Sequence, residues 1–135
     1  MLMVDIIEEI KSKIYDLFDK ETAYSISKYS GIPRQTVTDL MTGKTTLSKA
    51  KFITIEKLYR YASRPYYVEV QFDELDAGTD LFTILDVQIV HDSGPNYTVE
   101  ELFNEIPNQD EDRINYVATR LKELGYNNFS EVIEV

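Results

Sequence analysis

Residues 22–44 read TAYSISKYSGIPRQTVTDLMTGK, and this stretch decides the fold of the N-terminal half. Apolar residues recur at helical spacing from about Thr22 to Tyr29 and again from about Arg34 to Thr42, and Gly43 supplies a C-terminal stop. The sequence SGIP at positions 30–33 interrupts the pattern between the two segments. We therefore predict two short helices joined by a turn that contains glycine.

Two further helices are expected around this pair. From about Val4 to Asp19, apolar residues recur at helical spacing, and acids crowd the beginning, where the helix dipole favours negative charge. The fourth helix is expected to bury Phe52, Ile55, Leu58, Tyr59 and Ala62. Two short helices separated by a glycine-containing turn can present the second helix to a DNA major groove. The N-terminal half is thus expected to be an all-α bundle with a helix-turn-helix.

The stretch 22–44 resembles the helix-turn-helix of the Cro/C1-type (XRE-like) repressors of phages and other mobile elements, and the resemblance covers residues 1–64. The matching positions are the helix starts and anchors, the small residue between the helices, the turn glycine, the apolar plug and the exit glycine: Ala23, Ile26, Ser27, Gly31, Ile32, Val37, Leu40 and Gly43. One position departs from the family. Members of the family often have a phosphate-binding glutamine at the position where this chain has Ala23.

This resemblance implies sequence-specific binding of double-stranded operator DNA by a homodimer on an inverted repeat, and repression of transcription, including that of its own operon. Arginine can pair with guanine, glutamine with adenine, a threonine methyl with thymine, and aspartate can accept from cytosine. Cations just after the recognition helix would hold phosphates. The expected DNA-binding residues are Arg34, Gln35, Thr38 and Asp39 for bases, Thr36 at the phosphate-facing margin, and Lys44, Thr45, Thr46 and Lys49 for phosphates.

Charge divides the chain near Pro65, where a helical pattern gives way to an alternating one. The formal net charge of −10 over 135 residues would by itself argue against binding to a polyanion. Residues 1–64, however, hold 11 Lys and Arg against 8 acids, a net of +3, whereas residues 65–135 hold 3 against 16, a net of −13. We therefore expect two domains, 1–64 and 65–135, with different partners.

The second domain is expected to be a small acidic α+β domain, so that the whole chain is α+β. Residues 66–72 and 85–89 alternate with period two around a turn-rich stretch at 73–80, which predicts an antiparallel hairpin. A capping box at Thr98 and Glu101 predicts a short helix to about Glu105. A longer helix that buries Ile114, Val117, Ala118, Leu121 and Leu124 and ends at Gly125 follows, and 129–135 can form a final strand in a sheet of about three strands.

Several kinds of chemistry are excluded by composition and spacing. The chain has no cysteine and one histidine, His91, so disulfides and thiolate sites are impossible and a histidine metal site or a catalytic triad has little room. We expect His91 to be a hydrogen-bonded strand-end residue. A phosphate-binding loop ending at residues 43–45 would need glycine at position 38, which is threonine. The acidic stretch at 73–80 lacks the ligands of a calcium loop.

We therefore expect a non-enzymatic protein without a cofactor or metal. The N-terminus carries acids where a signal peptide has a basic start, and no apolar run approaches the ~20 residues of a membrane-spanning helix. These features predict an intracellular, cytoplasmic protein without a membrane partner.

The acidic domain has two alternative roles. It can dimerise, or its carboxylates can occupy the basic groove of a nucleic-acid-binding protein. In architecture and charge, the chain resembles certain type II anti-CRISPR proteins, in which a helix-turn-helix autorepressor is fused to a domain that binds Cas9. The expected protein-binding residues are Asp73, Glu74, Asp76, Asp80, Asp110, Glu111 and Asp112. A third class remains open, an adaptor whose helical bundle binds no DNA.

Overall fold

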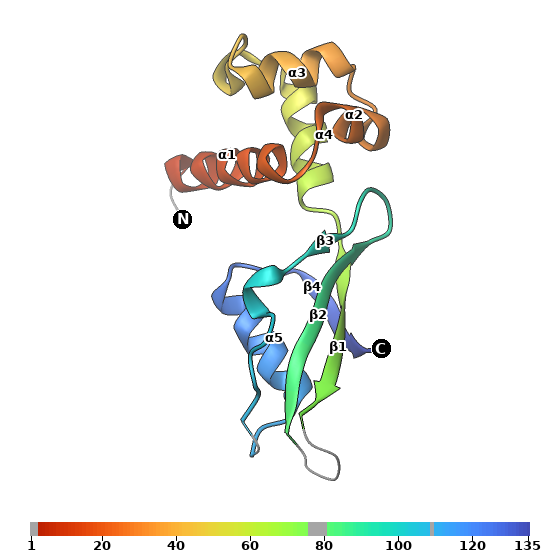
Figure 1. The fold of residues 1–135 in the computed structure, drawn as a ribbon. Helices are drawn as coiled ribbons and strands as arrows, with labels where there is room; N and C mark the ends of the chain where they lie inside the picture. The colour runs from red at the N-terminus through yellow and green to blue at the C-terminus, as the bar shows by residue number, and fades with distance from the viewer. Residues whose placement is uncertain (1–2, 76–80, 109) are drawn as a thin grey trace. The chain divides into compact units, whose positions relative to one another are not determined.

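The computed structural model describes residues 3–75, 81–108 and 110–135. In this part of the chain, five α-helices and one four-stranded mixed sheet confirm the predicted α+β class (Figure 1). The chain divides into two compact units. The N-terminal unit comprises Met1–Arg64 with Ser93–Pro95, and the C-terminal unit comprises Pro65–Asp92 with Asn96–Val135.

The N-terminal unit is helical and packs around one core. Buried apolar residues from every helix meet there, among them Ile14 of the first helix, Ile26 of the second and Leu58 of the last. The helix bounds lie within about two residues of those expected from the sequence. They are α1 (Met3–Lys20), α2 (Ala23–Ser30), α3 (Arg34–Thr42) and α4 (Phe52–Ala62), with a 3₁₀ turn, η1 (Leu47–Lys49), before α4.

One expected core position of α4 is wrong. Phe52 is 79% exposed, whereas Tyr61, which the apolar pattern did not select, is buried. Phe52 is the first residue of the helix, so it lies beyond the turn that packs on the core. Tyr61 is buried because its hydroxyl has an acceptor inside the unit, the carboxylate of Glu21.

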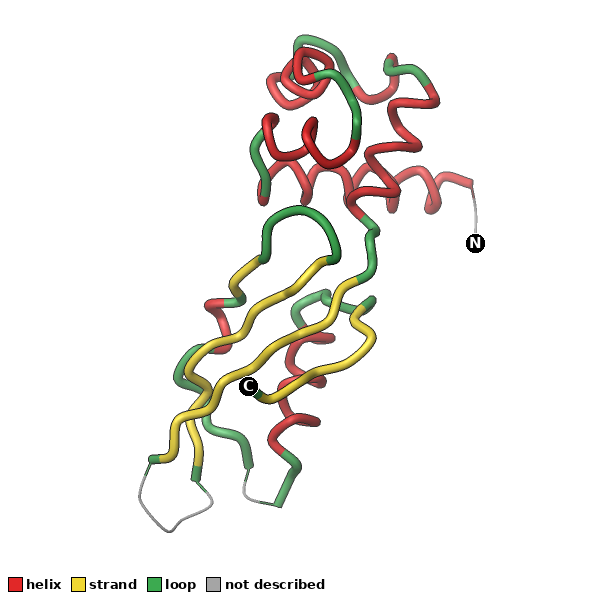
Figure 2. The backbone as a smooth tube through the Cα atoms, turned by 90° about the vertical axis from the view of Figure 1, so that its right-hand side faces the viewer, coloured by secondary structure: helices red, strands yellow, loops and turns green. Residues whose placement is uncertain are grey.

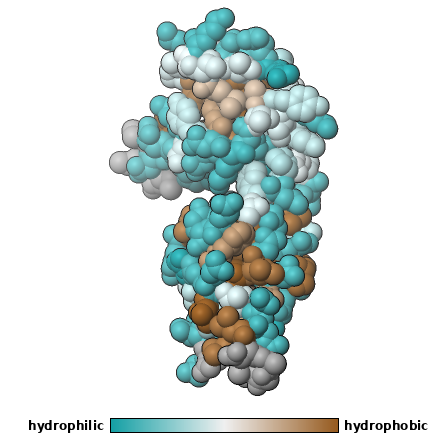
Figure 3. All heavy atoms as spheres, viewed as in Figure 1, coloured by the Kyte–Doolittle hydropathy of each residue, from teal (hydrophilic) through white to brown (hydrophobic). Residues whose placement is uncertain are grey.

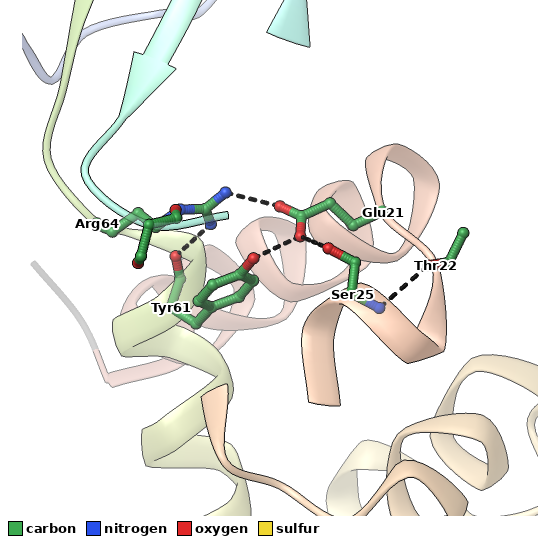
Figure 4. Close-up of polar contacts among 6 residues, drawn as sticks. Glu21, Thr22, Ser25, Tyr61 and Arg64 are labelled. Carbon is green, nitrogen blue, oxygen red and sulfur yellow. Dashed lines mark hydrogen bonds and ion pairs between the residues drawn. The ribbon is translucent and has the colours of Figure 1, made fainter. Parts of the chain in front are cut away.

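Glu21 lies between α1 and α2 and is the centre of a buried polar network (Figure 4). Its Oε2 lies 2.7 Å from Nη2 of Arg64, just after α4, and its Oε1 accepts hydrogen bonds from the hydroxyls of Tyr61 (2.5 Å) and Ser25 (2.9 Å). The side chains of Glu21 and Arg64 are only 0% and 9% exposed. Arg64 also donates to the carbonyl oxygen of Tyr61 at 2.7 Å. The network therefore ties the α1–α2 junction to the end of α4.

The C-terminal unit is a sheet with one covering helix. Its elements are β1 (Tyr66–Glu74), β2 (Phe82–His91), β3 (Tyr97–Thr98), a 3₁₀ turn η2 (Glu100–Leu102), α5 (Arg113–Glu123) and β4 (Phe129–Glu134). The strand order is β3-β2-β1-β4, and β1 pairs antiparallel with β2 and parallel with β4. Helix α5 covers one face of the sheet (Figure 2), where Val117 and Leu121 share a core with Val68 and Val70 of β1.

A β-bulge changes the expected phase of β2. Gln71 pairs with Asp86, but the next residue, Phe72, pairs with Ile84, so Leu85 is the extra residue. Leu85 is therefore exposed, and Ile84 takes the buried position. The alternation of residues 85–89 predicted the opposite for Leu85, because a strict period of two contains no bulge.

The helix expected after Thr98 is only the three-residue turn η2, and Thr98 does not cap it. Thr98 pairs with Gln88 in the sheet, and its hydroxyl accepts a hydrogen bond from the Gln88 amide at 2.9 Å. Residues 97 and 98 therefore form a short strand, β3, which is the fourth strand of a sheet expected to have about three.

Helix α5 ends as its sequence predicts, and its first turn is capped by Asp112, a residue expected from the sequence to bind a protein. The Asp112 carboxylate accepts from the backbone N–H of Ile114 at 2.9 Å, and Gly125, with φ of 96°, follows the last turn in the left-handed region. Arg120 on this helix makes two hydrogen bonds of 2.9 Å to the carboxylate of Glu105. Leu124, an expected core residue, is exposed because it lies at the C-cap.

Breaking the buried ion pair is expected to destabilise the N-terminal unit strongly. Glu21→Ala leaves the Arg64 guanidinium buried without its carboxylate and should lower the free energy of unfolding by about 3–5 kcal/mol. The double variant Glu21→Leu with Arg64→Met should lose less than the sum of the single variants. Urea unfolding of the full chain, followed by circular dichroism, measures both.

The control for this experiment is Glu56→Ala, whose partner Arg60 is 78% exposed at 3.4 Å. That change should cost at most about 1 kcal/mol. Equal losses for Glu21→Ala and Glu56→Ala would contradict the structural role of the buried pair.

The C-terminal unit is expected to lose stability in acid through Glu105. The hydrogen bond from Arg120 holds the pKa of Glu105 below its ordinary value, and a hydrogen bond from Tyr116 acts in the same direction. A lowered folded pKa stabilises the fold above the ordinary carboxyl pKa, and this contribution disappears as the pH falls through the folded pKa. Glu105→Gln should flatten the decline in unfolding free energy below about pH 5, whereas the exposed Glu101→Gln should not.

Candidate nucleic-acid interface

The turn between α2 and α3 is fixed by local contacts. Gly31 has φ of 79°, in the left-handed region, and its N–H donates to the carbonyl oxygen of Ser27 at 3.1 Å. The Ser27 hydroxyl donates to the carbonyl oxygen of Ile32 at 2.7 Å, and the Ser30 hydroxyl accepts from the N–H of Ile32 at 3.2 Å. Ile32 itself is buried. These bonds set the direction in which α3 leaves the turn.

Helix α3 is held by one face only. Val37 and Leu40 are buried and share the core with Ile26 of α2. Arg34 and Gln35 are exposed, and the side chains next to them on the outer face are half-buried. Figure 1 shows α3 lying along an outer surface of the N-terminal unit. The helix therefore presents a polar face that the bundle does not cover.

Two contacts organise this face. The Gln35 amide nitrogen donates to the Asp39 carboxylate at 2.8 Å, one helical turn along. The Arg34 guanidinium lies 5.7 Å from the centre of the Tyr24 ring on α2, within the range of a cation–π contact. Asp39 thus positions Gln35, and Tyr24 positions Arg34. The sequence pattern identified neither partner, since helix i,i+4 pairing alone does not say which way two exposed side chains turn.

A groove of about 440 Å³ lies beside the outer face of α3. Thr36 and Asp39 of α3 line it together with Thr45 and Lys49, so four of the expected DNA-binding residues meet there. Thr45 is held at the groove because its N–H donates to the Asp39 carbonyl oxygen at 3.1 Å. Lys44 and Thr46 are exposed in the segment that follows α3.

Two lysines of the groove were not among the DNA-binding residues predicted from the sequence. Lys51 at the start of α4 and Lys57, six residues later, line it with Lys49. Their charge was visible in the sequence, but their position depends on how α4 crosses α3, which no local pattern encodes. Lysines at 49, 51 and 57 make this side of α3 cationic.

The acidic candidates of the C-terminal unit are only partly brought together. Asp73 and Glu74 lie in β1 and not in a loop as expected, because they pair with Thr83 and Phe82 of β2. The start of α5 is at the same end of the sheet, since the Arg113 guanidinium lies 4.2 Å from the centre of the Phe82 ring. Asp76 and Asp80 lie outside the described residues.

The three acids before α5 are not equivalent. Asp110 is exposed, whereas Glu111 accepts a hydrogen bond from the Asn115 amide at 3.3 Å and Asp112 caps the helix. Glu111 and Asp112 therefore serve the first turn of α5. Arg113 in that turn makes a bidentate pair with Glu134 of β4, which offsets one cation of the unit.

A second group of carboxylates was not among the protein-binding residues predicted from the sequence. Glu69 and Asp86 lie on the sheet face opposite the one that carries Val68 and Val70, because side chains alternate along a strand. The Tyr67 hydroxyl on this face donates to Glu69 at 3.4 Å. Burial of the hydroxyl raises the Tyr67 pKa, and the charges of Glu69, Asp92 and Glu131 raise it further. These carboxylates gather around one tyrosine although they are far apart in the sequence.

Other kinds of site find little support in the described part of the chain. There, no three or more His, Asp or Glu residues lie close enough together to hold a metal ion. His91 ends β2 and contacts the rings of Tyr66 and Tyr97, with centroids 5.5 and 4.8 Å away. None of the helices in the described ranges has the length and apolar character needed to cross a membrane.

Comparisons with known proteins identify no relative of this chain. No protein-family model, no curated protein and no solved structure matches this chain. The candidate interface consists of the outer face of α3 and the cationic groove beside it.

Proposed function

We propose that this protein is a transcriptional repressor of the phage and mobile-element type, whose N-terminal unit is a helix-turn-helix domain that binds double-stranded DNA. The observation that carries the proposal is the uncovered polar face of α3, which lies beside a groove lined by Lys49, Lys51 and Lys57. A homodimer would place two such helices on an inverted repeat, with the operator of its own gene as the leading target.

The dimensions and chemistry of α3 fit a major groove. Nine residues at 1.5 Å each make a helix about 13 Å long, enough to follow a few base pairs. Arg34 can donate two hydrogen bonds to guanine, and Gln35 can pair with adenine. Asp39 would repel phosphates by itself, but its hydrogen bond to Gln35 gives it a positioning role on the same face.

Phosphate binding is supported by the charge of the surrounding residues. Residues 28–64 hold 8 basic and 2 acidic side chains, a net of +6. Lys44 and Lys49 follow α3 and are exposed, so both can reach a DNA backbone without unfolding the bundle. Such contacts fix register, while the side chains of α3 discriminate bases.

Arg34 is expected to contribute to sequence-specific affinity. Arg34→Ala should weaken binding to the cognate site by about 1–3 kcal/mol and relax preference at one base pair, because the arginine pairs with a base edge. Lys49→Ala should weaken binding to all sequences alike and reduce the salt slope by about one. Fluorescence anisotropy of the full chain with duplexes from the region upstream of its gene measures both.

Arg60→Ala is the matched control, since it removes the same charge from an exposed site on α4. It should change affinity little. If the wild-type chain binds no duplex at low salt, DNA binding is contradicted, and the adaptor reading of the bundle becomes the better one.

A second function is favoured by the carboxylates around Tyr67. We propose that this uncovered sheet face binds a protein with a cationic nucleic-acid groove, of which Cas9 is one example. Glu69, Asp86 and Glu131 present negative charge on a sheet, which holds their spacing more rigidly than a loop does. Asp73 and Glu74 of β1 and the acids at the start of α5, which were expected from the sequence, remain candidates at another part of the unit.

The two acidic surfaces can be separated by charge-neutral variants. Glu69→Gln with Glu131→Gln should weaken capture of Cas9 by the full chain by about tenfold or more, since rigid interface charges contribute more than exposed single ones. Asp73→Asn with Glu74→Asn removes two charges at the other site and is the matched control. Equal effects of the two pairs would contradict a specific sheet-face contact, and no capture by the wild-type chain would contradict this second function.

A further inference from the structure

The N-terminal unit exposes apolar side chains although it buries a charged one. Figure 3 shows hydrophobic residues at the surface of this unit between α1 and α3. Glu21, in contrast, is only 6% exposed, and no other charged residue of the described ranges is buried to that extent. Removing an ion pair from water costs free energy, and the best-attested use of such pairs is to fix one arrangement of a fold. The contacts of Glu21 and its partner Arg64 therefore indicate which arrangement this unit keeps.

A turn from another part of the chain completes this polar network. Residues Ser93–Pro95 belong to the N-terminal unit, although they lie between β2 and β3 in the sequence. The Nε of Arg64 donates to the carbonyl oxygen of Ser93 at 2.9 Å, while its Nη2 lies 2.7 Å from the Glu21 carboxylate. The guanidinium also lies over the Tyr61 ring, 4.0 Å from the ring centre. Arg64 thus binds the turn and the buried carboxylate at the same time.

Gly94 allows the turn to come this close to the network. Its φ is 90°, in the left-handed region. A Cβ atom at this position would lie 2.5 Å from the Tyr61 hydroxyl oxygen and 3.1 Å from Nη2 of Arg64. Both atoms are hydrogen-bonded to the Glu21 carboxylate, so neither can move away without breaking a buried bond. A larger residue at position 94 would therefore displace either the turn or the network.

Three polar contacts in succession connect the turn to α2. The Ser93 carbonyl oxygen accepts from Arg64, Arg64 pairs with Glu21, and the Glu21 carboxylate accepts from the Ser25 hydroxyl of α2 at 2.9 Å. Figure 4 shows the part of this series from Arg64 to Ser25. Helix α2 in turn shares its core with α3. The turn is thus linked through buried polar groups to the helix on which α3 packs.

We propose that the turn Ser93–Pro95 is a clamp, which holds α2 in position through Arg64, and that displacing the clamp weakens DNA binding. This inference rests on the proposed function, because the helix-turn-helix is the site that the clamp would regulate. It adds a means of regulation to that function. The clamp joins β2 to β3, so a protein that binds these strands can act on it through the chain itself.

Gly94→Ala in the full chain tests the clamp. The added methyl group should displace the turn, raise the rate of amide hydrogen exchange at residues 20–26 and weaken duplex binding by on the order of tenfold. Mass spectrometry measures the exchange, and fluorescence anisotropy measures the binding. Circular dichroism verifies that the helices are kept.

Gly125→Ala is the matched control. Gly125 has a similar φ of 96°, but a Cβ atom there would meet nothing within 4 Å, so the variant carries the same backbone strain without the clash. It should leave exchange at residues 20–26 and duplex binding as in the wild type. Equal effects of the two glycine variants, or wild-type exchange in Gly94→Ala, would overturn the proposal.

Arg64→Lys is a second variant, for the case that Gly94→Ala does not fold. Lysine keeps the charge near Glu21 but lacks the planar fork that bridges Glu21 and the Ser93 carbonyl. It should raise exchange at residues 20–26 in the same way. Wild-type exchange in this variant would mean that the turn does not act through Arg64.

The link from the network to α2 can be tested by a double-mutant cycle. Ser25→Ala removes the hydrogen bond between Glu21 and α2. In that background, Gly94→Ala should weaken duplex binding by less than it does in the wild type, because the series of contacts is already interrupted. Fully additive effects of the two changes would contradict transmission through Ser25.

Transmission from the strands can be tested at the base of the turn. The rings of His91, which ends β2, and Tyr97, which begins β3, lie 4.8 Å apart. Tyr97→Ala removes this contact and should raise exchange at residues 20–26. Phe82→Ala is the control, since it removes an aromatic ring at the opposite end of β2. Equal exchange in the two variants would contradict an effect through the turn.

The exchange and binding measurements separate the two proposals. If Gly94→Ala raises exchange but binds duplex as the wild type does, the clamp does not regulate DNA binding, and the inference is overturned while the proposed function stands. If the wild-type chain binds no duplex, the proposed function is wrong, and raised exchange in Gly94→Ala still supports the clamp as the element that holds α2.

Discussion

The carboxylate of Glu21 and the guanidinium of Arg64 lie 2.7 Å apart in the interior of the N-terminal unit, and the position of its helices depends on this pair. Glu21 lies in the connection between α1 and α2, and Arg64 lies just after the end of α4. Burial, together with the hydrogen bond to Glu21, raises the pKa of Tyr61 well above its ordinary value, so its hydroxyl remains a donor. Because α2 and α3 share one core with α4, anchoring α4 also supports the packing of α3.

The buried face of an element determines which of its side chains remain exposed. Val37 and Leu40 bury one face of α3, which leaves Arg34 and Gln35 on the outside. The same division applies in the C-terminal unit, where α5 covers one face of the sheet and Glu69 lies on the other. In both units, the polar groups proposed to bind partners occupy the faces that the core cannot use.

Local patterns predicted much of this protein correctly. The bounds of α3, the glycine after it and the end of α5 at Gly125 were all visible, because each depends on residues within a few positions of one another. Leu85 was assigned to the wrong face, since a bulge is specified by the pairing of two strands. Phe52 was assigned to the core because its spacing fits, although the core contacts of α4 begin one turn later, at Ile55.

The α+β class, most helix bounds, the division of charge near residue 64 and the hydrogen-bonding residues of α3 all follow from the amino-acid sequence. Three features depend on packing in space: the burial of Arg64 against Glu21, the groove that Lys51 and Lys57 line with Lys49, and the grouping of Glu69 and Glu131 around Tyr67. The two sets differ in the range of the interactions that produce them. Helix periodicity and capping are interactions between near neighbours in the chain, whereas burial and charge clustering depend on which distant segments pack together.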